Sequence, residues 1–198
     1  KTTLINLLMR FYDPLSGEIL INDKSYLKIN KTSLRGNIGM VLQDTWIYSG
    51  SISDNISYLK QDASFEEIKE AAKKAHADIF IENLPNKYET KVSNKSGLSE
   101  GQRQMIAIAR VMLLNPNLVI LDEATSNIDT RSEKLITDAF DNMMKDKTSI
   151  VIAHRLSTIE KADIIIVMKD GVIIETGNHK GLMNKQGFYY SLYSSQYK

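Results

Sequence analysis

The sequence predicts an α/β domain built on a parallel sheet, with a mostly helical segment inserted in it. Two apolar runs, at 117–123 and 148–154, are typical of buried strands, and a helical pattern separates them. Such alternation of strands and helices builds parallel sheets. We expect one domain over 1–198, with approximately 1–50 and 116–198 as the α/β core and approximately 51–115 as a helical subdomain.

The composition is that of an ordinary globular protein, with 42% hydrophobic and 25% charged residues. The net charge of +1 gives no field that would favour nucleic acid, so we expect no nucleic-acid partner. The absence of cysteine excludes a disulfide scaffold and a thiolate metal site. No apolar run reaches the roughly 20 residues that a membrane-spanning helix needs, and no signal peptide is recognised.

The first third of the chain reads as helix, strand, strand. Apolar residues at Leu4, Leu7, Leu8 and Phe11 have the spacing of one helix face. Pro14 ends this pattern, a strand is expected over 17–23, and a second strand ends at Gln43.

The middle of the chain is expected to be helical. The pattern from Ser64 to Leu84 predicts one helix that Pro85 ends, with Ile79 among its buried residues. A polar loop over 86–97 leads to a further helix over 98–114.

The last third returns to alternation. The strand at 117–123 is followed by a helix from about Asp129 to Met144 and by the strand at 148–154. The segment 163–177 predicts two strands joined by a turn at Lys169-Asp170-Gly171. The tail from His179 is predicted to form a helix.

Two carboxylates end the apolar run NLVILDE. Asp122 and Glu123 are therefore expected at the carboxyl end of a buried parallel strand, the edge where α/β sheets bind ligands. One carboxylate there suits Mg²⁺, which keeps several waters, and a second can orient or deprotonate a water that attacks a phosphate. The same letters also fit a strand that ends in a solvated Asp-Glu pair.

The segment LSEGQRQ predicts a helix start. Ser99 and Gln102 have the spacing of a capping box. Gly101 costs about 1 kcal/mol there relative to alanine, which makes sense if something approaches the backbone closely. A helix N-terminus with a nearby hydroxyl can bind an anion. The alternative is an ordinary capped helix with a tolerated glycine.

Three weaker signals are found elsewhere. Lys1, Thr2 and Thr3 stand at the start of the first helix. They fit the end of a phosphate-binding loop, and they also fit an ordinary helix start in which threonine is the N-cap. His154 and Gln43 each end a predicted strand. His154 could donate a hydrogen bond to a terminal phosphate, and the amide of Gln43 could reach a metal or a water in the same cleft. Taken singly, each also fits a structural role.

Taken in order, the segments KTT, VLQD, LSEGQRQ, VILDEATSNID and IAHRLST closely resemble the nucleotide-binding domain of ATP-binding cassette (ABC) transporters. They match the end of the Walker A loop, the Q-loop, the signature, Walker B with the D-loop, and the H-loop. RFYDPLSGEILIND and GVIIETGNH resemble the exporter-type branch, which includes multidrug and lipid exporters. The resemblance covers essentially the whole chain and implies a P-loop NTPase-like core with an inserted α-helical lobe and a C-terminal β-hairpin and helix.

The resemblance implies a site for ATP and Mg²⁺. Lys1 would hold the β- and γ-phosphates, Thr2 would be a ligand of Mg²⁺, and Thr3 would touch the α-phosphate. Asp122 would hold Mg²⁺ through water and Glu123 would be the general base. Gln43 would sense the metal and the γ-phosphate, which His154 would bind.

The resemblance also implies partners. Ser99, Gly101 and Gln102 of the signature would act on ATP held by a second nucleotide-binding domain, in a homodimer or heterodimer whose interface Asp129 crosses. A transmembrane domain, fused upstream, would place the chain at the cytoplasmic face of a membrane, where it powers export of an unknown substrate. The Walker A glycines would lie upstream of Lys1, so we expect the 198 residues alone to hydrolyse ATP poorly.

Three departures from the family pattern stand out. Glu100 occupies a position where the commonest signature has glycine, and the loop before Leu98 is one residue shorter than usual. The frequent Asp-Gly turn is replaced by Asn22-Asp23, which can form the same turn.

Two rival functions differ from the ABC exporter. A non-transport ABC ATPase of the chromosome-maintenance or DNA-repair kind would carry a long coiled coil between the Q-loop and the signature, but only 55 positions separate Gln43 from Leu98. A non-catalytic nucleotide-binding regulatory module is disfavoured by the presence of Glu123 and His154.

An apolar cluster follows the Q-loop. Trp46, Ile47 and Tyr48 lie where a loop is expected, so they either pack inside the helical lobe or form an exposed patch for a partner. The resemblance favours the partner, a helix of the membrane domain.

Overall fold

A computed structural model describes residues 1–42, 45–94, 97–122, 128–152 and 156–196 of the chain. The α-helices within these ranges are α1 Thr2–Leu8, α2 Lys31–Gly36, α3 Ile52–Ile56, α4 Phe65–Lys74, α5 Asp78–Ile81, α6 Glu100–Leu114, α7 Thr130–Met144, α8 Leu156–Glu160, α9 His179–Lys185 and α10 Phe188–Gln196. Three short 3₁₀ helices cover Tyr26–Lys28, Ser57–Leu59 and Lys87–Glu89. The strands are β1 Leu20–Ile21, β2 Lys24–Ser25, β3 Ile38–Val41, β4 Gly50–Ser51, β5 Lys91–Val92, β6 Leu118–Asp122, β7 Thr148–Ile152, β8 Ile165–Lys169 and β9 Val172–Gly177.

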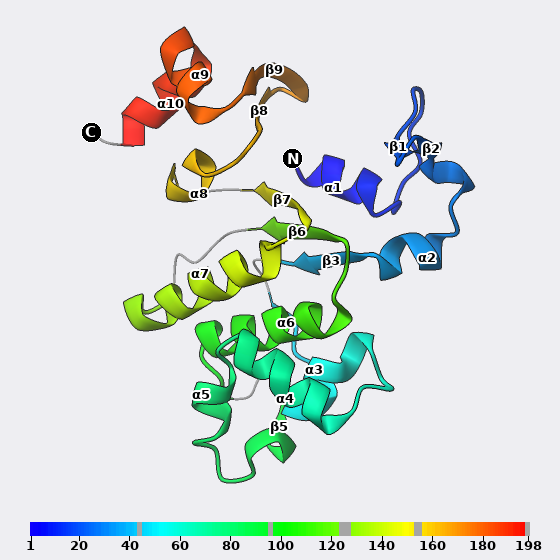
Figure 1. The fold of residues 1–198 in the computed structure, drawn as a ribbon, viewed down its shortest axis with the longest axis vertical. Helices are drawn as coiled ribbons and strands as arrows, with labels where there is room; N and C mark the ends of the chain where they lie inside the picture. The colour runs from blue at the N-terminus through cyan, green and yellow to red at the C-terminus, as the bar shows by residue number, and fades with distance from the viewer. Residues whose placement is uncertain (43–44, 95–96, 123–127, 153–155, 197–198) are drawn as a thin grey trace.

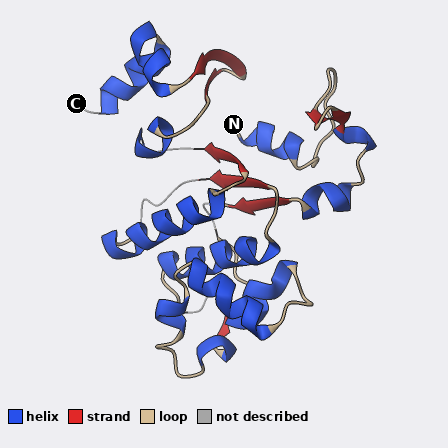
Figure 2. Ribbon diagram, in the orientation of Figure 1, coloured by secondary structure: helices blue, strands red, loops and turns tan. Residues whose placement is uncertain are grey.

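A parallel sheet of β3, β6 and β7 forms the centre of the described structure, with β6 in the middle (Figure 2). Ile38 pairs with Leu118 on one side of β6, and Leu118 pairs with Thr148 on the other. All three strands run in one direction, because the connections that join them contain helices long enough to return the chain to the same edge. The predicted parallel α/β sheet is therefore confirmed.

The two faces of β6 are covered by different helices. Val119 and Leu121 belong to the larger apolar core, which includes residues of α6 and α7. Ile120 belongs to a smaller core that contains Ile5 of α1 and Ile38 of β3. Because successive residues of a strand point to opposite faces, α1 packs on one face of the sheet, and α6 and α7 pack on the other.

Two tight turns in the structure have the geometry that their sequences predict. Asn22 and Asp23 both adopt positive φ, 48° and 60°, and join β1 to β2. Asp170 and Gly171 likewise adopt φ values of 50° and 81° between β8 and β9. Positive φ at both central residues is typical of the turns that close two-residue hairpins. The strand expected over 17–23 is shorter than predicted, because its chain turns back after two residues.

The single helix predicted from Ser64 to Leu84 is wrong. The chain forms α4 and then α5, and between them His76 adopts a left-handed φ of 57°. This break rotates the residues that follow it relative to α4, so Ile79, expected on the buried face, is 44% exposed. Ser64 and Glu67 form a capping box at the start of α4.

The predicted C-terminal helix is confirmed, but it is divided into two short helices, α9 and α10. Asn178 caps α9, and the carboxylate of Glu175 on β9 accepts hydrogen bonds from the backbone N–H groups of Phe188 and Tyr189 at the start of α10. Figure 1 shows these helices beside the β8–β9 hairpin. Among the described residues, the structure has no helix with the length and apolar character needed to cross a membrane.

Candidate functional site

The three residues that open the chain lie at the start of α1. The carbonyl oxygen of Lys1 accepts a hydrogen bond from the N–H of Leu4 at 3.0 Å, so the helix begins at once. The side chains of Lys1, Thr2 and Thr3 are exposed, whereas Ile5 is buried against the sheet. Packing of Ile5 therefore holds α1 on the sheet and leaves three polar side chains free at its start.

Asp122 ends β6 at the carboxyl edge of the sheet. It follows Ile120 by two residues, so it belongs to the strand face that α1 covers. Its side chain is partly exposed. In Figure 1 the strands β6 and β7 point to the left, and the first turn of α1 lies at the left end of that helix. Helix α1 and the side chain of Asp122 therefore belong to the same face of the sheet.

Three predicted site residues lie outside the described residues. Gln43, Glu123 and His154 follow the described ends of β3, β6 and β7 within two residues in the sequence. The three strands end at the same edge of the parallel sheet, but the roles of these residues stay predictions.

The capping box predicted at the signature is confirmed. The hydroxyl oxygen of Ser99 accepts a hydrogen bond from the N–H of Gln102 at 3.2 Å, and the side-chain oxygen of Gln102 accepts one from the N–H of Ser99 at 2.9 Å. Helix α6 begins directly after Ser99, whose side chain is exposed.

Gly101 is buried where α6 meets α7. A Cβ atom at this position would lie 2.9 Å from the Cβ of Ser132 and 3.3 Å from the Cγ2 of Ile128. The sequence predicts that something approaches this backbone closely, and in the structure the neighbour is a side chain of the same chain. Close approach of α7 is therefore sufficient to require glycine.

We expect Gly101→Ala to lower the free energy of unfolding by about 1–3 kcal/mol, because the added methyl group overpacks the contact with Ser132. The matched control is Gly36→Ala in α2, where a Cβ would meet no atom within 4 Å. Urea denaturation of the purified protein measures both. Equal stabilities of the two variants would show that the close contact does not constrain position 101.

Asp129 is the N-cap of α7. Its carboxylate accepts a hydrogen bond from the N–H of Ser132 at 3.0 Å, and hydrogen bonds from the backbone and hydroxyl of Ser132 lower the pKa of Asp129. The side chain of Asp129 is exposed. Because Gly101 also packs on Ser132, the starts of α6 and α7 form one unit that contains Ser99, Gly101 and Asp129.

The residues after the Q-loop form an exposed aromatic triad, which we define as Trp46, Tyr48 and Tyr58. Their ring centroids lie 5.6–6.0 Å apart, and each side chain is between 43% and 48% exposed. Ile47, between the first two, is buried. Of the two predicted alternatives, the aromatic residues of the cluster form the exposed patch and Ile47 packs inside.

Two polar residues beneath the triad were not among the predicted site residues. Asn55 is completely buried, and Arg110 of α6 donates hydrogen bonds to it. A sequence signal exists for Arg110, since it is a charged residue within the apolar run MIAIARVMLL. Such a residue needs buried partners or a solvent path.

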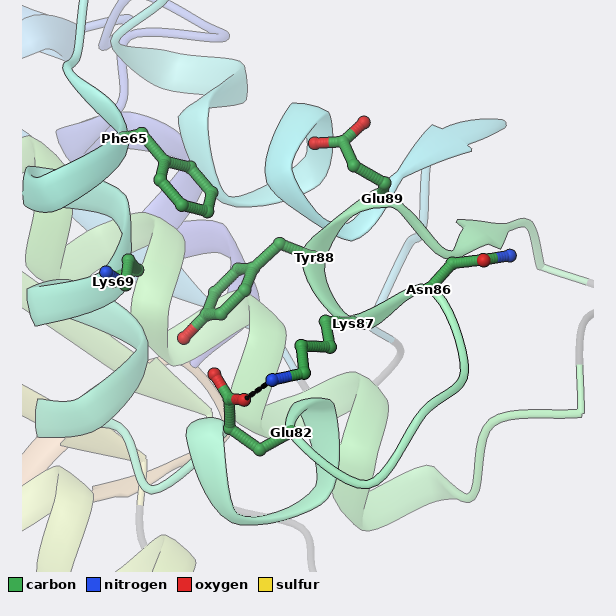
Figure 3. Close-up of a pocket in the computed structure, with 7 residues that line it drawn as sticks. All are labelled: Phe65, Lys69, Glu82, Asn86, Lys87, Tyr88 and Glu89. Carbon is green, nitrogen blue, oxygen red and sulfur yellow. Dashed lines mark ion pairs between the residues drawn. The ribbon is translucent and has the colours of Figure 1, made fainter.

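A shallow cavity of about 330 Å³ lies in the helical part of the chain. Figure 3 shows Tyr88 beside Phe65, with the ion pair between Lys87 and Glu82 at the rim. The two aromatic rings meet edge to face, with centroids 5.4 Å apart. None of the predicted site residues lines this cavity, so it is separate from the candidate nucleotide site.

The described residues include oxygen ligands that suit a metal, but these ligands do not form a cluster. No group of three or more His, Cys, Asp or Glu side chains that could hold a metal occurs in the described part of the chain. Thr2 lies in α1, and Asp122 ends β6, whose Ile120 shares an apolar core with Ile5 of α1. A single carboxylate and a hydroxyl fit Mg²⁺, which takes its remaining ligands from water and phosphate.

A sequence model described as ABC transporter matches residues 1–126. The chain is 52% identical over 193 residues to a fatty acid ABC transporter ATP-binding/permease protein of Mycobacterium bovis, which covers 97% of the chain and 31% of the relative. It is 50% identical over 197 residues to a putative multidrug export ATP-binding/permease protein of Bacillus subtilis, which covers 99% of the chain and 34% of the relative.

The fold also matches a solved structure. A bacterial Atm1-family ABC exporter with ATP bound superposes with a TM-score of 0.91 at 40% sequence identity, covering 99% of the chain and 34% of the exporter chain. The chain therefore spans about a third of the length of these relatives.

Proposed function

Because the chain belongs to the ABC transporter family, we propose that it binds and hydrolyses ATP to drive export of a substrate across a membrane. In this proposal residues 1–50 and 116–198 form the nucleotide-binding core, and residues 51–115 form a helical subdomain. The substrate is selected elsewhere in the protein, in a membrane-spanning part of the kind that the ATP-binding/permease relatives are named for.

One observation carries the proposal. Helix α1, which begins with an exposed lysine and two threonines, packs on the face of the parallel sheet to which Asp122 at the end of β6 belongs. Lysine and hydroxyl groups at such a position suit phosphate oxygens, and a strand-end carboxylate suits Mg²⁺. The site chemistry is therefore that of a nucleoside triphosphate with its metal.

Within the site each residue has a role. Lys1 and Thr3 bind phosphate oxygens, and Thr2 and Asp122 hold Mg²⁺, directly or through water. When bound, Mg²⁺ neutralises charge on the phosphates. Glu123 takes the proton of the attacking water, and Gln43 and His154 position that water and the terminal phosphate.

The second group of residues acts on a partner's nucleotide. Ser99, Gly101, Gln102 and Asp129 belong to helices that pack on the opposite face of the sheet from α1. This separation supports a head-to-tail dimer, in which the signature of one domain closes on ATP held by the other. The dimer is formed with an identical or a related nucleotide-binding domain.

The test is phosphate release by the purified whole protein in lipid vesicles, measured with ATP in the presence and absence of Mg²⁺. We expect hydrolysis that requires Mg²⁺. Absence of hydrolysis together with absence of ATP binding would overturn the proposal, whereas binding without hydrolysis would favour the regulatory module.

We expect Tyr48→Ala to weaken transport about 5-fold or more while ATP binding stays near normal, because exposed aromatic residues commonly anchor protein interfaces. The triad is proposed to receive a helix of the membrane-spanning part. Uptake of a fluorescent fatty acid and of the dye Hoechst 33342 into inside-out vesicles measures transport for the two substrate classes in the relatives' names.

The matched control is Tyr12→Ala, which removes an exposed tyrosine outside the triad. Normal uptake by Tyr48→Ala of the probe that the wild type moves would show that the triad is not a coupling surface. Global unfolding of Tyr48→Ala would lead to the same conclusion.

A further inference from the structure

Asn55 ties the backbone of the aromatic triad to helix α3. Its side-chain oxygen accepts a hydrogen bond from the N–H of Tyr48 at 2.8 Å, and its side-chain nitrogen donates to the carbonyl of Tyr48 at 2.9 Å. The same nitrogen donates to the carbonyl of Ser51 at 2.9 Å. Asn55 is 0% exposed, so these bonds replace water completely. A buried amide with three such bonds fixes the segment that it touches.

Arg110 ties this arrangement to helix α6. Its Nε donates to the carbonyl of Asn55 at 2.8 Å, and its Nη2 donates to the side-chain oxygen of Asn55 at 3.2 Å. Its Nη1 lies 3.4 Å from the carbonyl of Trp46, and the guanidinium lies 5.6 Å from the ring centroid of Tyr58. One side chain therefore contacts Asn55 and two members of the triad.

Helix α6 connects Arg110 to the start of the signature. The helix runs from Glu100 to Leu114 without interruption, and nine of its residues are buried, including Ile106 and Ile108. Ser99 lies eleven positions before Arg110, which corresponds to about 16 Å along an α-helix. A buried, continuous helix moves as one body, so a shift of its N-terminus displaces the guanidinium at the other end.

We propose that Asn55 and Arg110 are a positioning pair that couples the aromatic triad to the signature end of α6, so that occupancy of the nucleotide site changes the conformation of residues 46–58. The inference rests on the proposed function, since it requires ATP to act on Ser99. The coupling is reciprocal, because a ligand at either site must favour the same arrangement of α6.

The chemistry of the pair explains why arginine is needed. The guanidinium presents several N–H donors in a fixed plane and bonds two oxygens of Asn55 at once, which the single nitrogen of lysine cannot do in that geometry. Burial lowers the pKa of Arg110. Arg110→Lys keeps the charge and most of the side-chain volume and removes the paired bonds, which makes it the most informative variant.

The experiment is amide hydrogen exchange of the whole protein, followed by mass spectrometry, with and without Mg²⁺ and the ATP analogue AMP-PNP. In the wild type we expect the nucleotide to change exchange in 46–58 by about 5-fold or more, the low end of ordinary coupling between sites. In Arg110→Lys this change is lost, while protection of α1 by the nucleotide is retained. Exchange of β6 reports whether the variant is folded.

The matched control is Arg103→Lys on the same helix, which leaves every bond between Arg110 and the segment 46–58 in place. It should respond as the wild type does. Asn55→Ser removes the link from its other end and provides a second variant if Arg110→Lys unfolds.

The outcomes separate the inference from the proposed function. If the nucleotide fails to protect α1 in the wild type, the proposed function is wrong. If it protects α1 but leaves 46–58 unchanged, the coupling is wrong. A full response in folded Arg110→Lys or Asn55→Ser, or an equal loss in Arg103→Lys, also overturns the coupling.

Discussion

Replacing Glu123 with glutamine is expected to slow ATP hydrolysis roughly 10²-fold or more. Glutamine keeps the size of the side chain but cannot accept the proton of the attacking water, and general-base catalysis contributes about 10²–10⁴-fold. Phosphate release at saturating ATP and Mg²⁺ is the measurement. ATP binding should persist, so the ATP-bound dimer should accumulate, which size-exclusion chromatography with light scattering detects.

Glu18→Gln is the matched control for this variant, because it makes the same chemical change at an exposed residue that has no proposed role in the site. Its turnover should equal that of the wild type. Wild-type turnover by Glu123→Gln would remove Glu123 from the catalytic role. Loss of ATP binding would instead place Glu123 among the ligand-binding groups.

The change Ser99→Arg is expected to block closure of the dimer while each domain still binds ATP at its own α1 side. An arginine placed at the proposed interface adds bulk and a charge, and burial of an unpaired charge costs about 2–5 kcal/mol. The ATP-bound dimer should therefore weaken roughly 30-fold or more. In a mixed dimer only one of the two composite sites is affected, so about half of the turnover should remain if the sites act independently.

The structure adds a control that this experiment needs. Ser99 caps α6 by accepting a hydrogen bond from the N–H of Gln102. A substitution that removes this acceptor lowers the stability of the helix by about 0.5–2 kcal/mol. Ser99→Ala removes the cap without added bulk, and Ser99→Thr keeps it. If Ser99→Ala weakens the dimer as much as Ser99→Arg does, the loss reflects the start of the helix. If Ser99→Arg lowers the affinity of the isolated domain for nucleotide, the proposal that Ser99 acts on ATP held by the partner is wrong.

Local chemistry made several features of the fold predictable. The buried strand β6 is an apolar run in the sequence, the Ser99–Gln102 spacing predicted the start of α6, and Asn22-Asp23 predicted a tight turn. The strand β7 forms where an apolar run predicted a buried strand, but its residues are partly or fully exposed. Each of these signals acts over a few residues, so the sequence contains it in full. The strand end at Asp122 followed from the same reasoning.

Features that depend on tertiary contacts were not predictable. No local signal places a left-handed residue at His76, so the break between α4 and α5 was missed. The neighbour of Gly101 is Ser132, thirty-one positions away, and the buried bonds between Asn55 and Arg110 span fifty-five positions. Glycine and arginine at these positions are explained only when two distant segments pack together.

The pairing of the central sheet has a consequence for the order of folding. Ile38 pairs with Leu118, eighty positions along the chain, whereas Leu118 pairs with Thr148, thirty positions away. Closing the longer loop costs about 0.9 kcal/mol more conformational entropy, in a model where the cost grows with the logarithm of loop length. We therefore expect β6 and β7 to pair before β3 joins them. Prior folding of α3, α4 and α6 shortens the effective loop, so destabilising those helices should delay the docking of β3.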